Sequence, residues 1–292
     1  MNAPTRLAAY GAGLVGLVAG AYVFGDQVNH GDVANPSAGH STHATTSTSK
    51  EGDGMNMTAD STADEAGAAP GSLPPGLAVS ESGYSLAIPE TGYSAGRNTV
   101  SFQIIGPDGK PVTSYETTHE KDLHLIAVRR DFADFQHVHP VLNKATATWS
   151  VDLGLRPGAW RVFTDFVPGA GPAAGTDLVL GSDLIVPGNP GTLKLPAPQR
   201  TAQVDGYTVT VTGTLVAGQH SMLDFHVTKD GKPVTDLQPY LGAYGHLVAL
   251  REGDLAYLHV HPGGEPGDGV TKPGPDVDFG AEVPSAARYH LF

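Results

Sequence analysis

Two sets of three histidines are the residues of this sequence whose types and spacing best suit chemistry. The sets are His124, His137 and His139 and, at the same spacing, His246, His259 and His261. Side chains alternate between the two faces of a β-strand, so both histidines of each His-x-His pair should point to one face. If each segment folds as a hairpin, the first histidine joins the other two, with Cβ atoms about 4.5–8 Å apart.

The register expected for each hairpin follows from its turn. A two-residue turn at Gly253-Asp254 places His259 opposite Val248 in the second copy. The equivalent register in the first copy places His137 opposite Ile126. In both copies this register also sets the first histidine opposite the last one.

Three converging imidazoles predict a site for a first-row metal ion in each copy, and hence two ions per chain. Zinc and copper bind histidine nitrogen at about 2.0–2.1 Å, and three histidines with one open position form a known arrangement. Imidazoles are largely neutral near pH 7 and so are available as ligands. Copper is expected before zinc, because copper(II) binds nitrogen donors more tightly than the other divalent first-row ions.

The same histidines also fit a structural role. The face that carries them also carries Ile126, Val128 and Phe135 in the first copy, as the core-facing side of a strand would. A buried imidazole there can simply bond a backbone carbonyl. In that case the chain is an exported module that presents two sandwiches to a protein or glycan partner. A metal-dependent hydrolase or oxidase is a third alternative.

Further soft-metal ligands lie in a low-complexity segment, residues 26–76, which is rich in Ser, Thr, Ala, Gly and Asp. They are His30, His40, His43, Met55 and Met57. Such a composition buries too little apolar surface to fold, so we expect a disordered linker. Its histidines and thioethers are predicted as auxiliary metal ligands, the latter with a preference for copper(I). Compositional drift in a solvated tether would give the same pattern.

The remaining histidines and the aspartates near the turns are not predicted to bind the metal ion directly. His119, His220, His226 and His290 do not recur in register between the two copies, so we expect surface or structural positions for them. Asp131, Asp134 and Asp254 lie near the predicted turns, where a carboxylate could orient an imidazole by a hydrogen bond.

Composition excludes several function classes. The formal net charge of −13 disfavours a nucleic-acid partner, which needs clustered Lys and Arg. The chain has no cysteine, which excludes disulfides and thiolate metal sites. No nucleophile elbow, zinc-protease helix, phosphate-binding loop or dinucleotide fingerprint occurs in a suitable context. We therefore expect a protein that is not an enzyme.

An internal repeat places the histidines in duplicated domains. HLIAVRRDFADFQHVHP, starting at His124, recurs as HLVALREGDLAYLHVHP, starting at His246. The motif DGKPVT occurs at residues 108–113 and again at 230–235. A spacing of 246 − 124 = 122 residues is too long for a solenoid repeat and indicates two copies of one domain.

The pattern of apolar and turn residues in both copies predicts an all-β fold. Short apolar stretches alternate with turn residues every 8–12 positions, as in an antiparallel β-sandwich. We expect two tandem sandwiches of immunoglobulin-like or cupredoxin-like shape, at residues 77–190 and 200–292. The second copy has no counterpart of the last strand, DLVLGSDLIVP, of the first. Truncation of the sequence, or completion by a partner strand, would explain that difference.

The N-terminal segment, residues 1–25, predicts export. Leu7 to Gly25 are uncharged and follow Arg6, and this length is close to the roughly 20 residues that span a bilayer. The position of Arg6 places the rest of the chain outside the cytoplasm. The alternative is a cleaved signal peptide, since Ala19-Gly20-Ala21 is similar to a cleavage site.

The two hairpin motifs resemble a motif of exported or membrane-anchored bacterial proteins, many of them actinobacterial. The resemblance covers residues 77–292 and is specific at HLIAVRRDFADFQHVHP and HLVALREGDLAYLHVHP. It implies a β-sandwich and a loose association with heavy-metal handling, copper above all. Together with the histidines, it leads us to expect a membrane-tethered, non-enzymatic, copper-binding protein that acts outside the cytoplasm.

Overall fold

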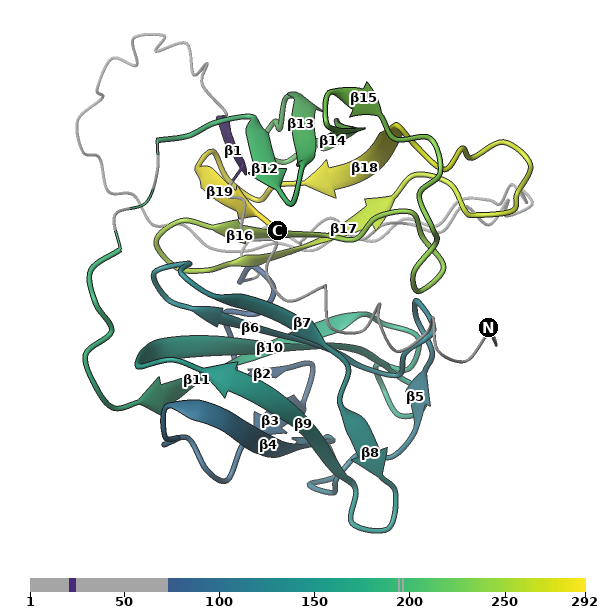
Figure 1. Cartoon of the computed structure of the whole chain (residues 1–292). Helices are drawn as coiled ribbons and strands as arrows, with labels where there is room; N and C mark the ends of the chain where they lie inside the picture. Colours follow the sequence, from purple (N-terminus) through teal and green to yellow (C-terminus); the bar gives the residue numbers. More distant parts are fainter. Residues whose placement is uncertain (1–20, 25–72, 194, 196) are drawn as a thin grey trace, which may run out of the picture.

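The computed structural model describes residues 21–24, 73–193, 195 and 197–292 of the chain, with the backbone alone for 21–24, His259 and His261. These residues form strands, turns and loops without a helix, which confirms the all-β class. Figure 1 shows two sandwiches stacked on each other, the first repeat in blue and teal and the second in green and yellow.

The first repeat is a sandwich of two separate sheets. Its strands are β2 (Ser80–Glu81), β3 (Tyr84–Ala87), β4 (Gly96–Ile105), β5 (Tyr115–Glu116), β6 (His124–Arg129), β7 (Phe135–Val138), β8 (Val141–Asn143), β9 (Thr148–Leu155), β10 (Gly158–Pro168) and β11 (Leu178–Val186). One sheet has the order β11-β10-β6-β7, with β5 on β10, and the other has the order β2-β3-β4-β9-β8. Alternate residues such as Val100, Phe102 and Ile104 of β4 fill the space between them.

The second repeat joins the equivalent strands into one curled sheet. Its strands are β12 (Thr201–Val204), β13 (Tyr207–Gly213), β14 (His220–Lys229), β15 (Lys232–Pro233), β16 (Leu247–Arg251), β17 (Tyr257–Pro262), β18 (Asp276–Glu282) and β19 (Arg288–Leu291). The long sheet runs β19-β16-β17-β18-β14-β13-β12, because β17 pairs with β18 at His261 and Pro262. Its own core includes Leu223, Leu258 and Phe279.

A short strand from the N-terminal segment lies on the outer edge of β19. Strand β1 (Ala21–Phe24) pairs antiparallel with β19, where β11 pairs with β10 in the first repeat. Of the predicted membrane anchor, residues 7–25, the structure describes only this strand. None of the described residues belongs to a helix long and apolar enough to cross a membrane.

The two histidine hairpins have the register that the sequence predicts. His137 pairs with Ile126, and His259 pairs with Val248. The prediction of a two-residue turn at Gly253-Asp254 is wrong, since the loop runs over residues 252–255 below the Arg251–Ala256 hydrogen bond. The longer loop has the same centre as the predicted turn, so the register is unchanged.

The histidine-bearing face of each hairpin packs against the other repeat instead of facing its own core. Ile126 and Val128 of β6 form a buried cluster with Val248 and Leu250 of β16. The neighbouring residues on the opposite face, such as Leu125, belong to the core of their own sandwich. Strand β6 is therefore buried on both faces, and the predicted core-facing side is an interface between the repeats.

Candidate metal centre between the repeats

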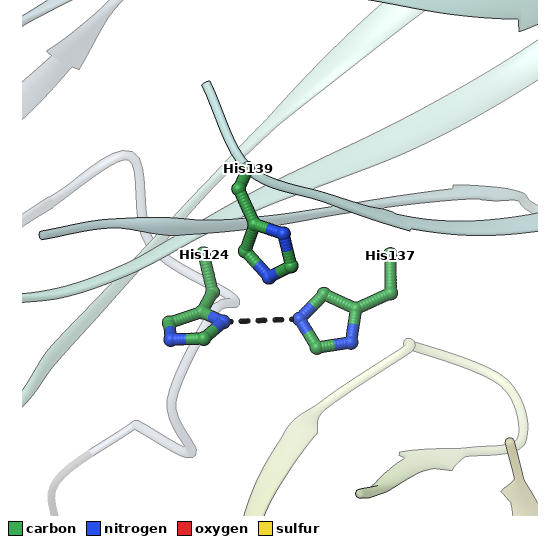
Figure 2. Close-up of side chains that lie close together, drawn as sticks. All are labelled: His124, His137 and His139. Carbon is green, nitrogen blue, oxygen red and sulfur yellow. Dashed lines mark hydrogen bonds between the residues drawn. The ribbon is translucent and has the colours of Figure 1, made fainter. Parts of the chain in front are cut away.

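Three histidines of the first repeat converge in the structure. His124 begins β6, His137 lies in β7 and His139 follows β7 directly. Figure 2 shows their rings directed toward a common point, with ring centres 4.9–5.3 Å apart. One nitrogen from each ring lies within 4.8 Å of the others. Imidazoles on one ion with bonds of about 2.0–2.1 Å have ring centres about 5 Å apart, so the spacing fits a shared metal.

Hydrogen bonds fix the first ring of this set. His124 Nε2 lies 3.1 Å from the carbonyl oxygen of Thr118, which can only accept, so Nε2 carries the proton. The other nitrogen, Nδ1, is thereby left as the atom that can accept a proton or bind a metal. It lies 3.1 Å from His137 Nε2, which donates to it in the metal-free protein. Metal binding would replace this hydrogen bond by two coordinate bonds.

One imidazole nitrogen of the set is buried without a hydrogen-bond partner. It is His139 Nε2. Burying a polar atom unpaired costs about 1–3 kcal/mol, so such atoms are rare in folded proteins. A metal ion among the three rings would satisfy this nitrogen.

Burial also keeps two of the imidazoles unprotonated. Desolvation, and then the neighbouring imidazoles, lower the pKa of His137 to about 3 and that of His139 to about 4. Both rings are therefore neutral at pH 7, which is the form that binds metals.

The second repeat contributes His246 to the same place. Its ring centre lies 6.3 Å from that of His137 and 5.7 Å from that of His119. His246 Nε2 lies 2.8 Å from the carbonyl oxygen of Tyr240, as His124 Nε2 does from Thr118. The duplicated loops thus hold the first histidine of each set in the same way.

The other members of the second set are known from the backbone alone. His259 pairs with Val248 and His261 with Gly280, and their side chains lie outside the described residues. The predicted linker ligands also lie outside the described residues; they are His30, His40, His43, Met55 and Met57.

A small pocket of about 30 Å³ lies beside the cluster and contains residues that sequence reasoning missed. His119 lines it, although the sequence suggested a surface or structural position. Asp165 of β10 and Tyr257 of β17 also line it, joined by a buried hydrogen bond of 2.9 Å from the tyrosine hydroxyl to the carboxylate. Asp165 is buried and lies opposite His124 in the sheet. In the sequence, only the HisxxxxHis spacing of His119 and His124 could have indicated that His119 lies beside the cluster.

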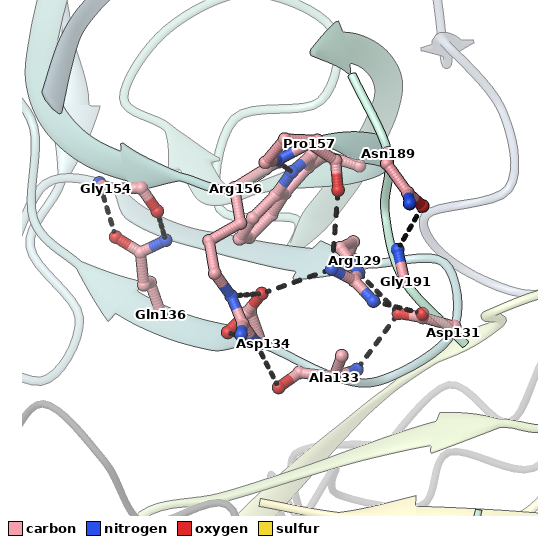
Figure 3. Close-up of polar contacts among 11 residues, drawn as sticks. Arg129, Asp131, Ala133, Asp134, Gln136, Gly154, Arg156, Pro157, Asn189 and Gly191 are labelled. Carbon is pink, nitrogen blue, oxygen red and sulfur yellow. Dashed lines mark hydrogen bonds and ion pairs between the residues drawn. The ribbon is translucent and has the colours of Figure 1, made fainter. Parts of the chain in front are cut away.

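The carboxylates expected beside the imidazoles lie elsewhere. Asp131 accepts hydrogen bonds from Arg129, and Asp134 from Arg156, in the network at the hairpin loop that Figure 3 shows. Asp254 is bound by Arg251 in the same manner. These carboxylates stabilise the hairpin loops, at the end of each hairpin remote from the histidines. They bind arginine instead of imidazole because a guanidinium is the stronger partner.

Three other histidines have roles unrelated to the cluster. His220 is exposed, and His226 is half-exposed and bonded through Nδ1 to Asp276 at 2.5 Å. His290 is buried and stacks on Phe132 of the first repeat, with ring centres 3.6 Å apart. The prediction of surface or structural positions therefore describes these three.

Comparison with known proteins identifies a family without assigning a function. The family model described as "Domain of unknown function (DUF8832)" matches residues 78–175 and 202–292. No curated protein sequence matches the chain.

Solved structures with some likeness include three described as "Marsupial T cell receptor", at 12%, 11% and 12% identity and TM-scores of 0.22, 0.21 and 0.22. Each alignment covers 68% of this chain, and they cover 56%, 53% and 84% of the respective receptor chains. The chain thus spans little more than half the length of the first two. At these TM-scores the likeness supports no inference about function.

Proposed function

Because the chain belongs to the DUF8832 family, which has no stated function, we propose a function from the site itself: the protein binds a metal ion through His124, His137 and His139. The ion is copper, and zinc binds the same site more weakly. The protein acts by holding the ion and is not an enzyme.

The observation that carries the proposal is the convergence of these three imidazoles around a buried, unpaired nitrogen. A structural role for the histidines would satisfy each ring with protein partners, as Thr118 does for His124. His139 Nε2 has none. The ring-centre distances of 4.9–5.3 Å are those of ligands on one ion.

The chemistry of the donors supports copper. An all-imidazole set of neutral rings suits copper(II) and zinc(II), and copper(II) forms the stronger complexes with nitrogen ligands. The resemblance of the hairpins to exported proteins associated with copper supports the same ion. We further propose that the N-terminal segment directs the protein out of the cytoplasm and holds it there, and that the linker histidines and methionines capture or pass on copper. We also propose that each sandwich is immunoglobulin-like or cupredoxin-like in shape.

Metal binding at these residues can be tested on the full chain. We expect the protein, after dialysis against equal copper and zinc, to retain copper in elemental analysis, and the double variant His137→Ala/His139→Ala to retain one ion fewer. A saturating ion should also raise the thermal midpoint, since ligands that bind the native state stabilise it by mass action. The double variant should lose that rise.

His226→Ala is the matched control, because this histidine is half-exposed on β14 and is bonded to Asp276 instead of to the cluster. It should retain metal like the parent. Equal metal content in the parent and the double variant would overturn the proposal, and would leave the protein- or glycan-binding module as the better interpretation.

A further inference from the structure

His246 faces the three-histidine cluster from the other repeat. Its ring centre is 6.3 Å from that of His137, while the three rings of the first repeat are 4.9–5.3 Å apart. The difference of about 1 Å is within the range that small changes of side-chain torsions supply.

The ring of His246 has a defined orientation. Its Nε2 donates to the carbonyl oxygen of Tyr240, so Nδ1 is the nitrogen with a free lone pair. A ligand histidine usually donates its second N–H to a carbonyl or carboxylate, which fixes the tautomer and the ring plane. His124 has the same arrangement with Thr118.

The loops that hold these two histidines are equivalent. Thr118 bridges to Lys121, and Tyr240 bridges to Ala243, in isolated β-bridges at the same offset of 240 − 118 = 122 residues. The residue after each carbonyl has a positive φ, 47° at His119 and 48° at Leu241. Left-handed backbone at bulky residues is strained and is found where surrounding structure enforces it. Both repeats therefore keep a loop whose carbonyl oxygen binds Nε2 of the first histidine and leaves Nδ1 as the nitrogen that can bind a metal ion.

We infer that His246 is the fourth ligand of the ion held by His124, His137 and His139, so that one metal ion joins the two repeats. This inference rests on the function proposed above. It replaces the sequence-based expectation of one separate ion per repeat, because His246 then belongs to the first repeat's ion.

The surroundings of His246 fit this role. The pocket that it lines with His124 and His137 is also lined by the apolar residues Leu247 and Val248. The pocket has a volume of about 30 Å³, which leaves room for an ion beside these rings. Four imidazoles complete a coordination shell that copper(II) and zinc(II) both accept.

The number of coordinated nitrogens is the direct test. One equivalent of copper(II) is added to the full chain, and electron paramagnetic resonance counts the imidazoles. We expect four in the parent and three in His246→Ala, with an affinity lower by at least roughly 10–100-fold, the loss that removal of even a hydrogen-bond partner of a ligand causes. Added free imidazole should restore the four-nitrogen signal to the variant, which a structural role of His246 would not explain.

Two comparisons separate this inference from the proposed function. Copper bound through three nitrogens and with lower affinity by His246→Ala, but lost by His137→Ala/His139→Ala, supports both. Unchanged nitrogen count and affinity in His246→Ala, with loss in the double variant, would refute the fourth ligand alone. Any copper bound by the linker is the same in the parent and in all variants, so it does not affect the differences in copper content and nitrogen count between them.

Hydrogen exchange tests the bridging itself. In the parent, copper should slow exchange in β16 of the second repeat as well as in β6 of the first. In His246→Ala, copper should protect β6 alone. Equal protection of β16 by copper in both proteins would contradict a metal ion that joins the repeats. His119→Ala is the control, since its ring also lies near His246 but its removal should leave the nitrogen count at four.

Discussion

At the scale of single residues, the His139 side chain shows that the cluster is not optimised for stability. Its Nε2 is buried with no hydrogen-bond partner, and burial lowers its pKa to about 4. Replacing such a group by an apolar one of similar size is often neutral or stabilising. Natural sequences retain these groups mainly where they serve binding or catalysis.

His139→Leu should therefore separate stability from metal binding. We expect the metal-free variant to be as stable as the parent or more stable by up to about 1–3 kcal/mol, and to lose the copper-dependent rise in thermal midpoint. Calorimetry with and without copper measures both effects. His226→Leu serves as the control. A metal-free His139→Leu protein that melts well below the parent would point to a structural imidazole.

The sequence could predict which histidines converge, but not what surrounds them. Alternation along β6 and β7 was enough to place His137 opposite Ile126. His119 and Asp165 were missed because no local pattern links them to the cluster. Asp165 reaches the pocket through the pairing of β10 with β6, and its partner Tyr257 comes from the other repeat.

At the scale of elements, each histidine hairpin ends in an arginine–aspartate pair. Arg129 is buried and binds Asp131, and Arg251 binds Asp254. The pairs occur at the same place although the aspartates are one position out of register. The hairpin loop therefore keeps the interaction while its sequence changes. These contacts lie remote from the histidines, so the two ends of the hairpin should respond separately to substitution.

Asp131→Ala tests that separation. It leaves the buried Arg129 guanidinium without its closest carboxylate, which should destabilise the protein by about 1–3 kcal/mol. The hydrogen bond from Arg129 lowers the pKa of Asp131, so its contribution is present above about pH 4 and is lost as pH falls through the folded pKa. Copper affinity should stay within about twofold of the parent. A large loss of affinity in titration calorimetry would show that the loop and the histidines are coupled.

At the scale of the whole molecule, the repeats pack through the faces that carry their histidines. Ile126, Val128, Val248 and Leu250 form one buried cluster across the interface. From sequence alone this face could not be distinguished from a sandwich core, because burial on both sides of a strand gives the same apolar residues. Only the arrangement of the two copies shows that their histidine faces meet.

His290 is another buried imidazole of this interface. It lies on β19, stacks on Phe132 of the first repeat, and has Nε2 3.8 Å from a carboxylate oxygen of Glu252. Burial lowers its pKa to about 4. The unfolded chain takes up a proton near pH 6.5, whereas the folded protein resists it, so this group's contribution to stability falls as pH decreases from about 6.5 toward 4.

His290→Phe keeps an aromatic ring against Phe132 and removes the proton-binding nitrogen. The parent and this variant should therefore differ little in thermal midpoint at pH 7 and progressively more in acid, with the variant favoured by about 1–2 kcal/mol near pH 5. Other buried histidines titrate in both proteins and leave the difference unaffected. Thermal unfolding of both proteins is measured by circular dichroism in metal-free buffers. If the two proteins lose stability in parallel as the pH falls, His290 gains its proton without disturbing the contact between the repeats. A growing difference would establish that this interface weakens on acidification independently of any metal ion.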